Sequence, residues 1–114
     1  MITRIHLSAK NIPKMDFLSK TDAYFMIYYH GEQLYKSEIQ KGSQVTWNCA
    51  NVDIPDEARK IDLLLYDDDG PGRMDDKICE VSLGLPLEPN SYLISGVKNS
   101  SITLSVLDQY GCVV

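Results

Sequence analysis

Five aspartates crowd into one short stretch of the sequence, YDDDGPGRMDD (residues 66–76), around two glycines and a proline. Carboxylates this close together repel one another unless a cation neutralises them. Oxygen ligands without sulfur or imidazole nearby select Ca²⁺ or Mg²⁺ over transition metals. Ca²⁺ accepts about six to eight oxygens in an adaptable geometry that loops can supply, whereas Mg²⁺ usually takes a small octahedral site and brings a phosphate substrate. The chemistry of this stretch therefore favours calcium.

The net charge of the chain is concentrated in two segments. Residues 16–22 and 67–76 hold seven aspartates and two basic residues, and the nine acidic residues elsewhere are balanced by nine basic ones. The seven aspartates are Asp16, Asp22, Asp67, Asp68, Asp69, Asp75 and Asp76. The whole formal charge of −5 thus belongs to these two segments. A charge that served only solubility would be spread over the surface, so the clustering indicates a site, and the acidic balance argues against nucleic-acid binding.

The length and composition indicate a single domain over residues 1–114, with 44 % hydrophobic residues to form its core. No apolar run approaches the ~18 residues that a membrane span needs, and the N-terminal stretch lacks the apolar region of a signal peptide. Three cysteines without a CxxC pair fit reduced thiols better than a disulfide framework. We therefore expect a cytoplasmic protein.

Short runs with period-two alternation, or rich in aromatic and β-branched residues, predict eight strands. They span residues 4–10, 23–30, 33–39, 46–54, 60–67, 77–85, 91–95 and 101–107. Only residues 55–60 (PDEARK) suit a helical turn, and this segment is too short to anchor a helix. With a turn signal about every dozen residues, the pattern is typical of an all-β, eight-stranded antiparallel Greek-key β-sandwich.

Strand direction predicts where the acidic segments lie. If consecutive strands run up and down, the first strand ends at residues 11–22, the third returns to 40–45 and the fifth returns to 67–76. These three segments then share one end of the sandwich. Both acidic segments are expected to meet there.

Other uses of the aspartates are less consistent with the sequence. An EF-hand frame beginning at Asp67 puts Ile78 where a bidentate glutamate is required, and the flanking segments are predicted strands rather than helices. The chain is too short for the nucleotide-binding domain that a nucleotide-sugar enzyme would need. It has no GxSxG, P-loop, HExxH or GxGxxG motif, and no nucleophile–base pair stands out. We therefore expect a binding protein and not an enzyme.

The motifs resemble those of C2 domains, the calcium- and phospholipid-binding β-sandwiches of signalling and membrane-trafficking proteins. The stretch SAKNIPKMDFLSKTDAYF resembles the first-loop pattern of the family, VTWN resembles the segment near its second loop, and LLLYDDDGPGRMDDKICEV resembles its third loop. The resemblance covers residues 2–107. The position of the first and last strands is similar to the circularly permuted, type II strand order of the family.

The resemblance implies a set of metal ligands for two or three Ca²⁺ ions. Asp16 and Asp22 match the ligands of the first loop, and Asp67 and Asp69 match those of the third. The fifth carboxylate stays open, because counting forward from Asp69 selects Asp75 while counting back from Ile78 selects Asp76. Backbone carbonyl ligands are implied at Met15 and Asp68.

Apolar residues at the loop tips suggest contact with a membrane. Phe17 and Leu18 lie between the two first-loop aspartates, and Pro71 and Met74 lie in the third loop. We expect calcium-dependent binding of anionic phospholipid membranes, with peripheral membrane association of a cytoplasmic protein when calcium rises. The alternative is a protein–protein interaction or scaffold module, free-standing or part of a larger chain, in which calcium only orders the loops.

Overall fold

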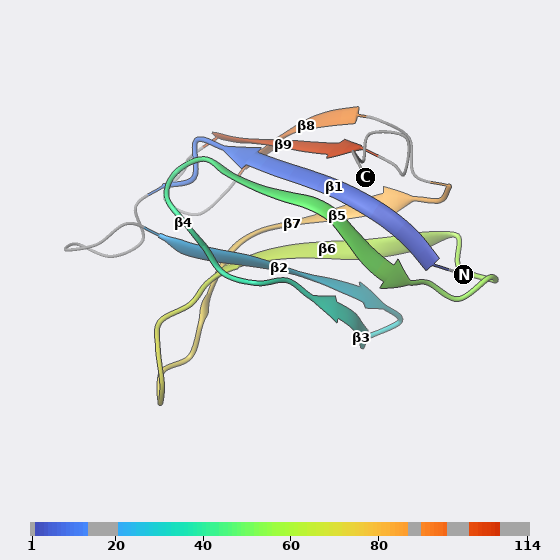
Figure 1. The fold of residues 1–114 in the computed structure, drawn as a ribbon, viewed down its shortest axis with the longest axis horizontal. Coiled ribbons are helices and arrows are strands. Elements are labelled where there is room, and N and C mark those ends of the chain that lie inside the picture. Colours follow the sequence, from blue (N-terminus) through green and yellow to red (C-terminus); the bar gives the residue numbers. More distant parts are fainter. Residues whose placement is uncertain (1, 14–20, 87–89, 96–100, 108–114) are drawn as a thin grey trace.

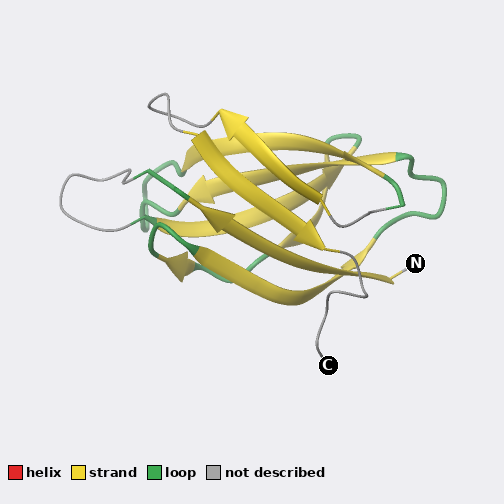
Figure 2. Cartoon of the chain, turned by 90° about the horizontal axis from the view of Figure 1, so that it is seen from above, coloured by secondary structure: helices red, strands yellow, loops and turns green. Residues whose placement is uncertain are grey.

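The computed structural model describes residues 2–13, 21–86, 90–95 and 101–107, and within these ranges the fold contains strands and no helix (Figures 1 and 2). Nine strands are formed there. They are β1 (Ile2–Lys10), β2 (Asp22–Tyr29), β3 (Glu32–Lys36), β4 (Gln40–Lys41), β5 (Val45–Asp53), β6 (Lys60–Asp67), β7 (Asp76–Gly84), β8 (Asn90–Ser95) and β9 (Ser101–Leu107). All eight predicted strands are present, and most of their ends agree within one or two residues.

The strands form two antiparallel sheets that face each other as the two layers visible in Figure 1. One sheet has the order β5-β1-β9-β8. The other has the order β3-β2-β6-β7, and the short strand β4 also pairs with β2. Because β1 and β2 lie in different sheets, the connection between them crosses from one layer to the other. The predicted all-β antiparallel sandwich is confirmed.

The core fills the space between the sheets with the apolar side chains of alternate strand positions. In β6, Ile61, Leu63 and Leu65 are buried at every second position, as expected for a strand with one face toward the core. Phe25 of β2 meets the indole of Trp47 of β5 edge to face, with ring centroids 5.1 Å apart. This contact joins the two layers.

The third predicted strand, 33–39, is too long. Strand β3 ends at Lys36, and Ser37 then binds β2 through both its backbone and its side chain. The Ser37 N–H donates to the Phe25 carbonyl (2.9 Å), while the Ser37 hydroxyl oxygen accepts from the Phe25 N–H (2.9 Å). The next carbonyl, of Glu38, accepts a hydrogen bond from Trp47 Nε1 (2.9 Å). These side-chain bonds replace the regular ladder, so residues 37–39 bend away before β4 begins.

The turns that connect strands at the far end of the sandwich are short. The two-residue turn at 30–31 joins β2 to β3. The segment 55–60 forms a single turn closed by a hydrogen bond from the Ala58 N–H to the Pro55 carbonyl (3.0 Å), and β6 begins at Lys60. These two connections are thus tight backbone turns.

The three segments predicted to share one end of the sandwich do so. The Asp68 N–H donates to the Asp22 carbonyl (2.8 Å), the Gly42 N–H donates to the Thr21 carbonyl (2.9 Å), and the Ile12 N–H donates to the Ser43 carbonyl (3.1 Å). These bonds link residues 11–22, 40–45 and 67–76. The prediction from strand direction is confirmed for the described part of each segment.

Candidate metal centre

The last residue of β6 is an aspartate on the core-facing side of the strand. The alternation that buries Ile61, Leu63 and Leu65 continues to Asp67, whose side chain is only 1 % exposed. Asp67 Oδ1 accepts a hydrogen bond from the backbone N–H of Asp22 (3.0 Å). A carboxylate is thus held at the rim of the core, beside the start of β2. Burial of a carboxylate is costly unless it is compensated.

A register shift between β6 and β7 places a second carboxylate opposite the first. Leu65 pairs with Cys79, but Tyr66 pairs with Lys77, so β7 contains one extra residue at Ile78. Because of this bulge, Asp67 is paired with Asp76 rather than with Lys77. Bulges commonly redirect side chains next to functional sites. Like charges directly opposite each other destabilise a sheet, which makes this pairing a feature that folding alone does not favour.

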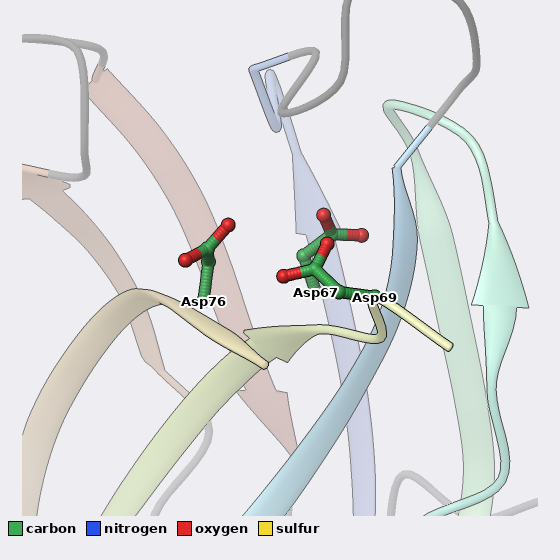
Figure 3. Close-up of side chains that lie close together, drawn as sticks. All are labelled: Asp67, Asp69 and Asp76. Carbon is green, nitrogen blue, oxygen red and sulfur yellow. The ribbon is translucent and has the colours of Figure 1, made fainter. Parts of the chain in front are cut away.

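A third carboxylate completes a cluster of acidic groups above the strand ends. One oxygen each from Asp67, Asp69 and Asp76 lies within 4.8 Å of the other two. Figure 3 shows Asp67 and Asp69 side by side, with Asp76 reaching up from the start of β7 beside them. Oxygens that share one Ca²⁺ are at most about 4.6–5.2 Å apart, because each lies about 2.3–2.6 Å from the ion. The cluster therefore fits a calcium ion in both ligand type and spacing.

Loop three, residues 68–75, projects beyond the ends of β6 and β7 (Figure 1). It reverses direction at Gly70 and Gly72, whose φ angles of 85° and 76° lie in the region that favours glycine. The Asp68 side chain accepts a hydrogen bond from the Gly70 N–H (3.3 Å) at its Oδ1 atom. The tip carries Pro71 and Met74, both exposed to solvent, and Met74 is 91 % exposed.

Asp75, which precedes Asp76 in the sequence, forms hydrogen bonds outside the cluster. Its Oδ2 accepts a hydrogen bond from the hydroxyl of Tyr24, and its Oδ1 accepts one from the backbone N–H of Asp69 (3.1 Å). These two hydrogen bonds, the one from Tyr24 first, hold the pKa of Asp75 below its ordinary value. Burial, followed by the bond to Asp75, raises the pKa of Tyr24 above its ordinary value. Of the two aspartates that the sequence leaves as alternatives, the structure brings Asp76 into the cluster and joins Asp75 to Tyr24.

Asp22 reaches the cluster through its backbone. Its N–H binds Asp67, and its carbonyl accepts from Asp68. Its side-chain Oδ1 lies 3.7 Å from Nζ of Lys41, the residue with which it is paired across β2 and β4. The site thus has a basic side chain at its edge as well as its acidic residues.

The structure places the site residues predicted from the sequence in different ways. Asp67, Asp69 and Asp76 come together, Asp22 and Asp68 adjoin them, and Asp75 lies beside them with a different partner. The predicted membrane-contacting residues Pro71 and Met74 are exposed in loop three. The other four predicted residues, Met15, Asp16, Phe17 and Leu18, lie outside the described residues.

Two residues at the site were not identified from the sequence. The alternation of β2 could have placed Tyr24 on the outer face of its sheet, but nothing in the sequence indicates that its hydroxyl meets Asp75. Lys41 becomes part of the site because β4, which the sequence did not predict, lies beside Asp22. A two-residue strand is too short for periodicity to reveal it.

Comparison with known families identifies the family of the chain. The family model of the C2 domain matches residues 2–101. The chain belongs to the C2 domain family. The type II strand order stays a prediction, although β1 leads directly into residues 11–21 and pairs with the last strand, β9.

Several solved C2 domains are similar to this one. A structure described as that of a C2 domain has a TM-score of 0.70 and 13 % identity, covering 95 % of this chain and 97 % of the other. The first of the C2 domains of a plant extended synaptotagmin 1 has a TM-score of 0.64 and 14 % identity, with 93 % of each chain covered. A structure of two C2 domains of extended synaptotagmin 2 has a TM-score of 0.66 and 18 % identity, and the match covers 94 % of this chain and 40 % of that two-domain chain.

No curated protein sequence matches the chain. Within the described ranges, no helix has the length and hydrophobicity that a bilayer-spanning segment requires.

Proposed function

We propose that this C2 domain binds anionic phospholipid membranes in a calcium-dependent manner, through the loops at its acidic end. The observation that carries the proposal is the convergence of Asp67, Asp69 and Asp76, with one oxygen of each within 4.8 Å of the others. The register shift in β7 and the burial of Asp67 hold two of these groups on rigid strand ends. Asp16 and Asp22 are proposed as further ligands from the first loop, and Met15 and Asp68 as carbonyl ligands. Two or three Ca²⁺ ions are proposed for the full site.

The charge of the loops makes membrane binding depend on calcium. The two acidic segments carry a formal charge of −5, which the negative surface of an anionic membrane repels. Two bound Ca²⁺ ions offset four of these negative charges and provide open coordination positions for lipid oxygens. Without calcium the loops and the membrane repel each other, so neither can approach closely. Binding to the membrane therefore depends on calcium.

The apolar tip of loop three provides the second half of the affinity. Met74 is 91 % exposed, and Pro71 in the same loop is also exposed. Full burial of an apolar side chain of this size contributes about 1.5–3 kcal/mol. This energy becomes available once the acidic groups below the tip are neutralised. Phe17 and Leu18 are proposed to act in the same way from the first loop.

The proposed role is one of binding and not of catalysis. We infer a cytoplasmic protein, or a module of a longer cytoplasmic chain, that associates peripherally with membranes when calcium rises. The alternative is an interaction module in which calcium orders the loops without any contact with lipid. The two differ in what the calcium-loaded loops touch.

Cosedimentation with phosphatidylserine-containing vesicles tests the proposal. The wild-type domain should pellet with vesicles in calcium and stay in the supernatant with chelator. The double variant Asp67→Asn plus Asp69→Asn should lose calcium-dependent pelleting, because two of the three clustered carboxylates become neutral. Its fold should persist, since an asparagine oxygen at position 67 can still accept the hydrogen bond from the Asp22 N–H.

A matched variant separates site chemistry from overall charge. Asp56→Asn plus Glu57→Gln removes the same two charges from the exposed turn at the other end of the sandwich, and it should pellet like the wild type. Circular dichroism and thermal unfolding in chelator check that both variants are folded. Retained vesicle binding by the Asp67→Asn, Asp69→Asn variant would contradict the proposal. Calcium binding by the wild type without vesicle binding would favour the interaction module.

A further inference from the structure

Tyr24 is held in one position by two contacts with its ring. Its side chain is only 4 % exposed although it lies on the outer face of its sheet. The ring stacks on Tyr66 of β6, with centroids 5.8 Å apart and 15° between the planes. Lys36 Nζ lies 4.8 Å from the ring centroid, a cation–π arrangement. The Tyr24 hydroxyl is consequently a donor whose position is fixed by the sheet.

Asp75 connects that fixed hydroxyl to the candidate metal centre. One of its oxygens accepts from the Tyr24 hydroxyl, and the other accepts from the backbone N–H of Asp69 at 3.1 Å. The side chain of Asp69 is one of the three clustered carboxylates. A chain of two hydrogen bonds therefore runs from β2 to the backbone of a proposed ligand.

A second attachment fixes the other end of the same peptide segment. The N–H of Asp68 donates to the carbonyl of Asp22 at 2.8 Å. Residues 68 and 69 are thus tied to β2 twice, once directly and once through Asp75. Both attachments are hydrogen bonds made by the protein itself.

We propose that Tyr24 and Asp75 are positioning residues for the metal centre, forming a brace that holds Asp69 in place before calcium arrives. The inference rests on the proposed function and adds a role for two residues that do not belong to the three-carboxylate cluster. A loop ordered in advance loses less conformational entropy when it binds. The brace also keeps Asp75 hydrogen-bonded to Tyr24 and to the backbone of Asp69, outside the three-carboxylate cluster.

The test is Tyr24→Phe, which removes the hydroxyl and keeps the ring with its stacking. Calcium titration by calorimetry should show about tenfold weaker binding, the factor expected for one hydrogen bond to a charged group, with unchanged stoichiometry. Tyr28→Phe is the matched control. Tyr28 lies on the same strand and is half-buried, and its hydroxyl lies 3.8 Å from the Met26 sulfur, away from the acidic cluster. The calcium affinity of this control should equal that of the wild type.

A calcium-free measurement separates positioning from general stability. Amide hydrogen exchange followed by NMR in chelator should show faster exchange at Asp69 in Tyr24→Phe, with the amides of Phe25 and Leu65 in the sheet unchanged. A purely structural role would raise exchange throughout the β2–β6 ladder and would overturn the inference. The single variants Tyr24→Phe and Asp75→Asn break the same chain of hydrogen bonds. The double variant that combines them should therefore bind calcium no more weakly than whichever single variant has the lower calcium affinity. Additive losses would overturn the inference.

The calorimetry also distinguishes this inference from the proposed function. Wild-type binding together with unchanged or tighter binding by Tyr24→Phe would overturn the brace and leave the calcium site intact. No calcium binding by the wild type would overturn both.

Discussion

The two ends of β6 differ in how they manage charge. At its start, the turn at 55–60 carries both signs, with Glu57 and Arg59 exposed to solvent, and backbone hydrogen bonds close it. At its end, Asp67 is 1 % exposed, faces Asp76 across the ladder and has Asp69 beside it. The charges at the start of β6 are thus compatible with a stable sandwich, whereas the end of β6 brings like charges together.

The difference shows which parts of the molecule serve folding and which serve binding. Like charges opposite each other in a sheet are destabilising, and proteins accept such local conflicts mainly at functional sites. The apolar core between the sheets compensates for this cost. Substitutions in the core should therefore weaken the fold, whereas substitutions of the clustered aspartates should weaken calcium binding and spare or even strengthen the fold.

The largest effect on stability should come from the core. Leu65 is fully buried two residues before Asp67, and Leu65→Ala should lower the free energy of unfolding by about 2–5 kcal/mol through lost burial and a cavity. Urea unfolding in chelator measures this. Leu93→Ala is the matched control, because Leu93 is 77 % exposed and its truncation should change stability by less than about 0.5 kcal/mol. Equal losses of unfolding free energy in the two variants would contradict the view that the core, and not the surface, determines stability.

A smaller effect, of opposite sign, should come from the acidic cluster. In chelator, Asp69→Asn should raise the free energy of unfolding by about 0.5–1 kcal/mol, because it removes one of three neighbouring like charges. In calcium the wild type should instead be more stable than Asp69→Asn. The wild type gains about 2.7 kcal/mol at a calcium concentration one hundred times its dissociation constant, and the variant loses most of this gain. Thermal unfolding with and without calcium checks both signs.

The control for that measurement is a charge removed at the other end. Glu57→Gln changes the net charge by the same amount in the exposed turn before β6. It should leave both the calcium-free stability and the calcium response as in the wild type. If Asp69→Asn destabilised the calcium-free domain, the view of the cluster as a cost to folding would be wrong.

Much of the fold could be predicted because its signals are local. The alternation in residues 60–67 reproduces the bounds of β6, and strand direction alone brings three distant segments to one end. Residues 37–39 were predicted wrongly because Ser37 hydrogen-bonds to Phe25 of the neighbouring strand. A hydrogen bond between a side chain and a neighbouring strand does not change the alternation of apolar and polar residues, so the sequence pattern cannot reveal it.

The site was predictable in composition but not in detail. The crowding of aspartates identifies the loop, yet two neighbouring residues, Asp75 and Asp76, are chemically identical in the sequence. What separates them is a register shift at Ile78 and a hydroxyl supplied by Tyr24, 51 residues earlier in the chain than Asp75. Both depend on how strands are paired, which a single sequence does not specify at the level of one residue.

The smallest effect should come from the lysine at the edge of the site. Lys41 Nζ lies 3.7 Å from Asp22 Oδ1 and is 65 % exposed, so this ion pair should contribute only about 0–1 kcal/mol to stability. Lys41→Gln should lower the calcium-free stability within that range. The same change should tighten calcium binding by up to about fivefold, because Asp22 loses a competing cation and the site loses a positive charge.

Lys60→Gln removes the same charge at the start of β6 and should change neither stability nor calcium affinity, as measured by urea unfolding and calorimetry. The predicted effects of Lys41→Gln on stability and on calcium affinity have opposite signs, and this distinguishes two roles of the lysine. If Lys41 supported the site, its loss would weaken both folding and calcium binding. If it only offsets the charge of Asp22 when calcium is absent from the solution, its loss weakens folding in chelator and strengthens binding in calcium. Weaker calcium binding in Lys41→Gln would therefore mean that this lysine helps to build the acidic end and does not compete for it.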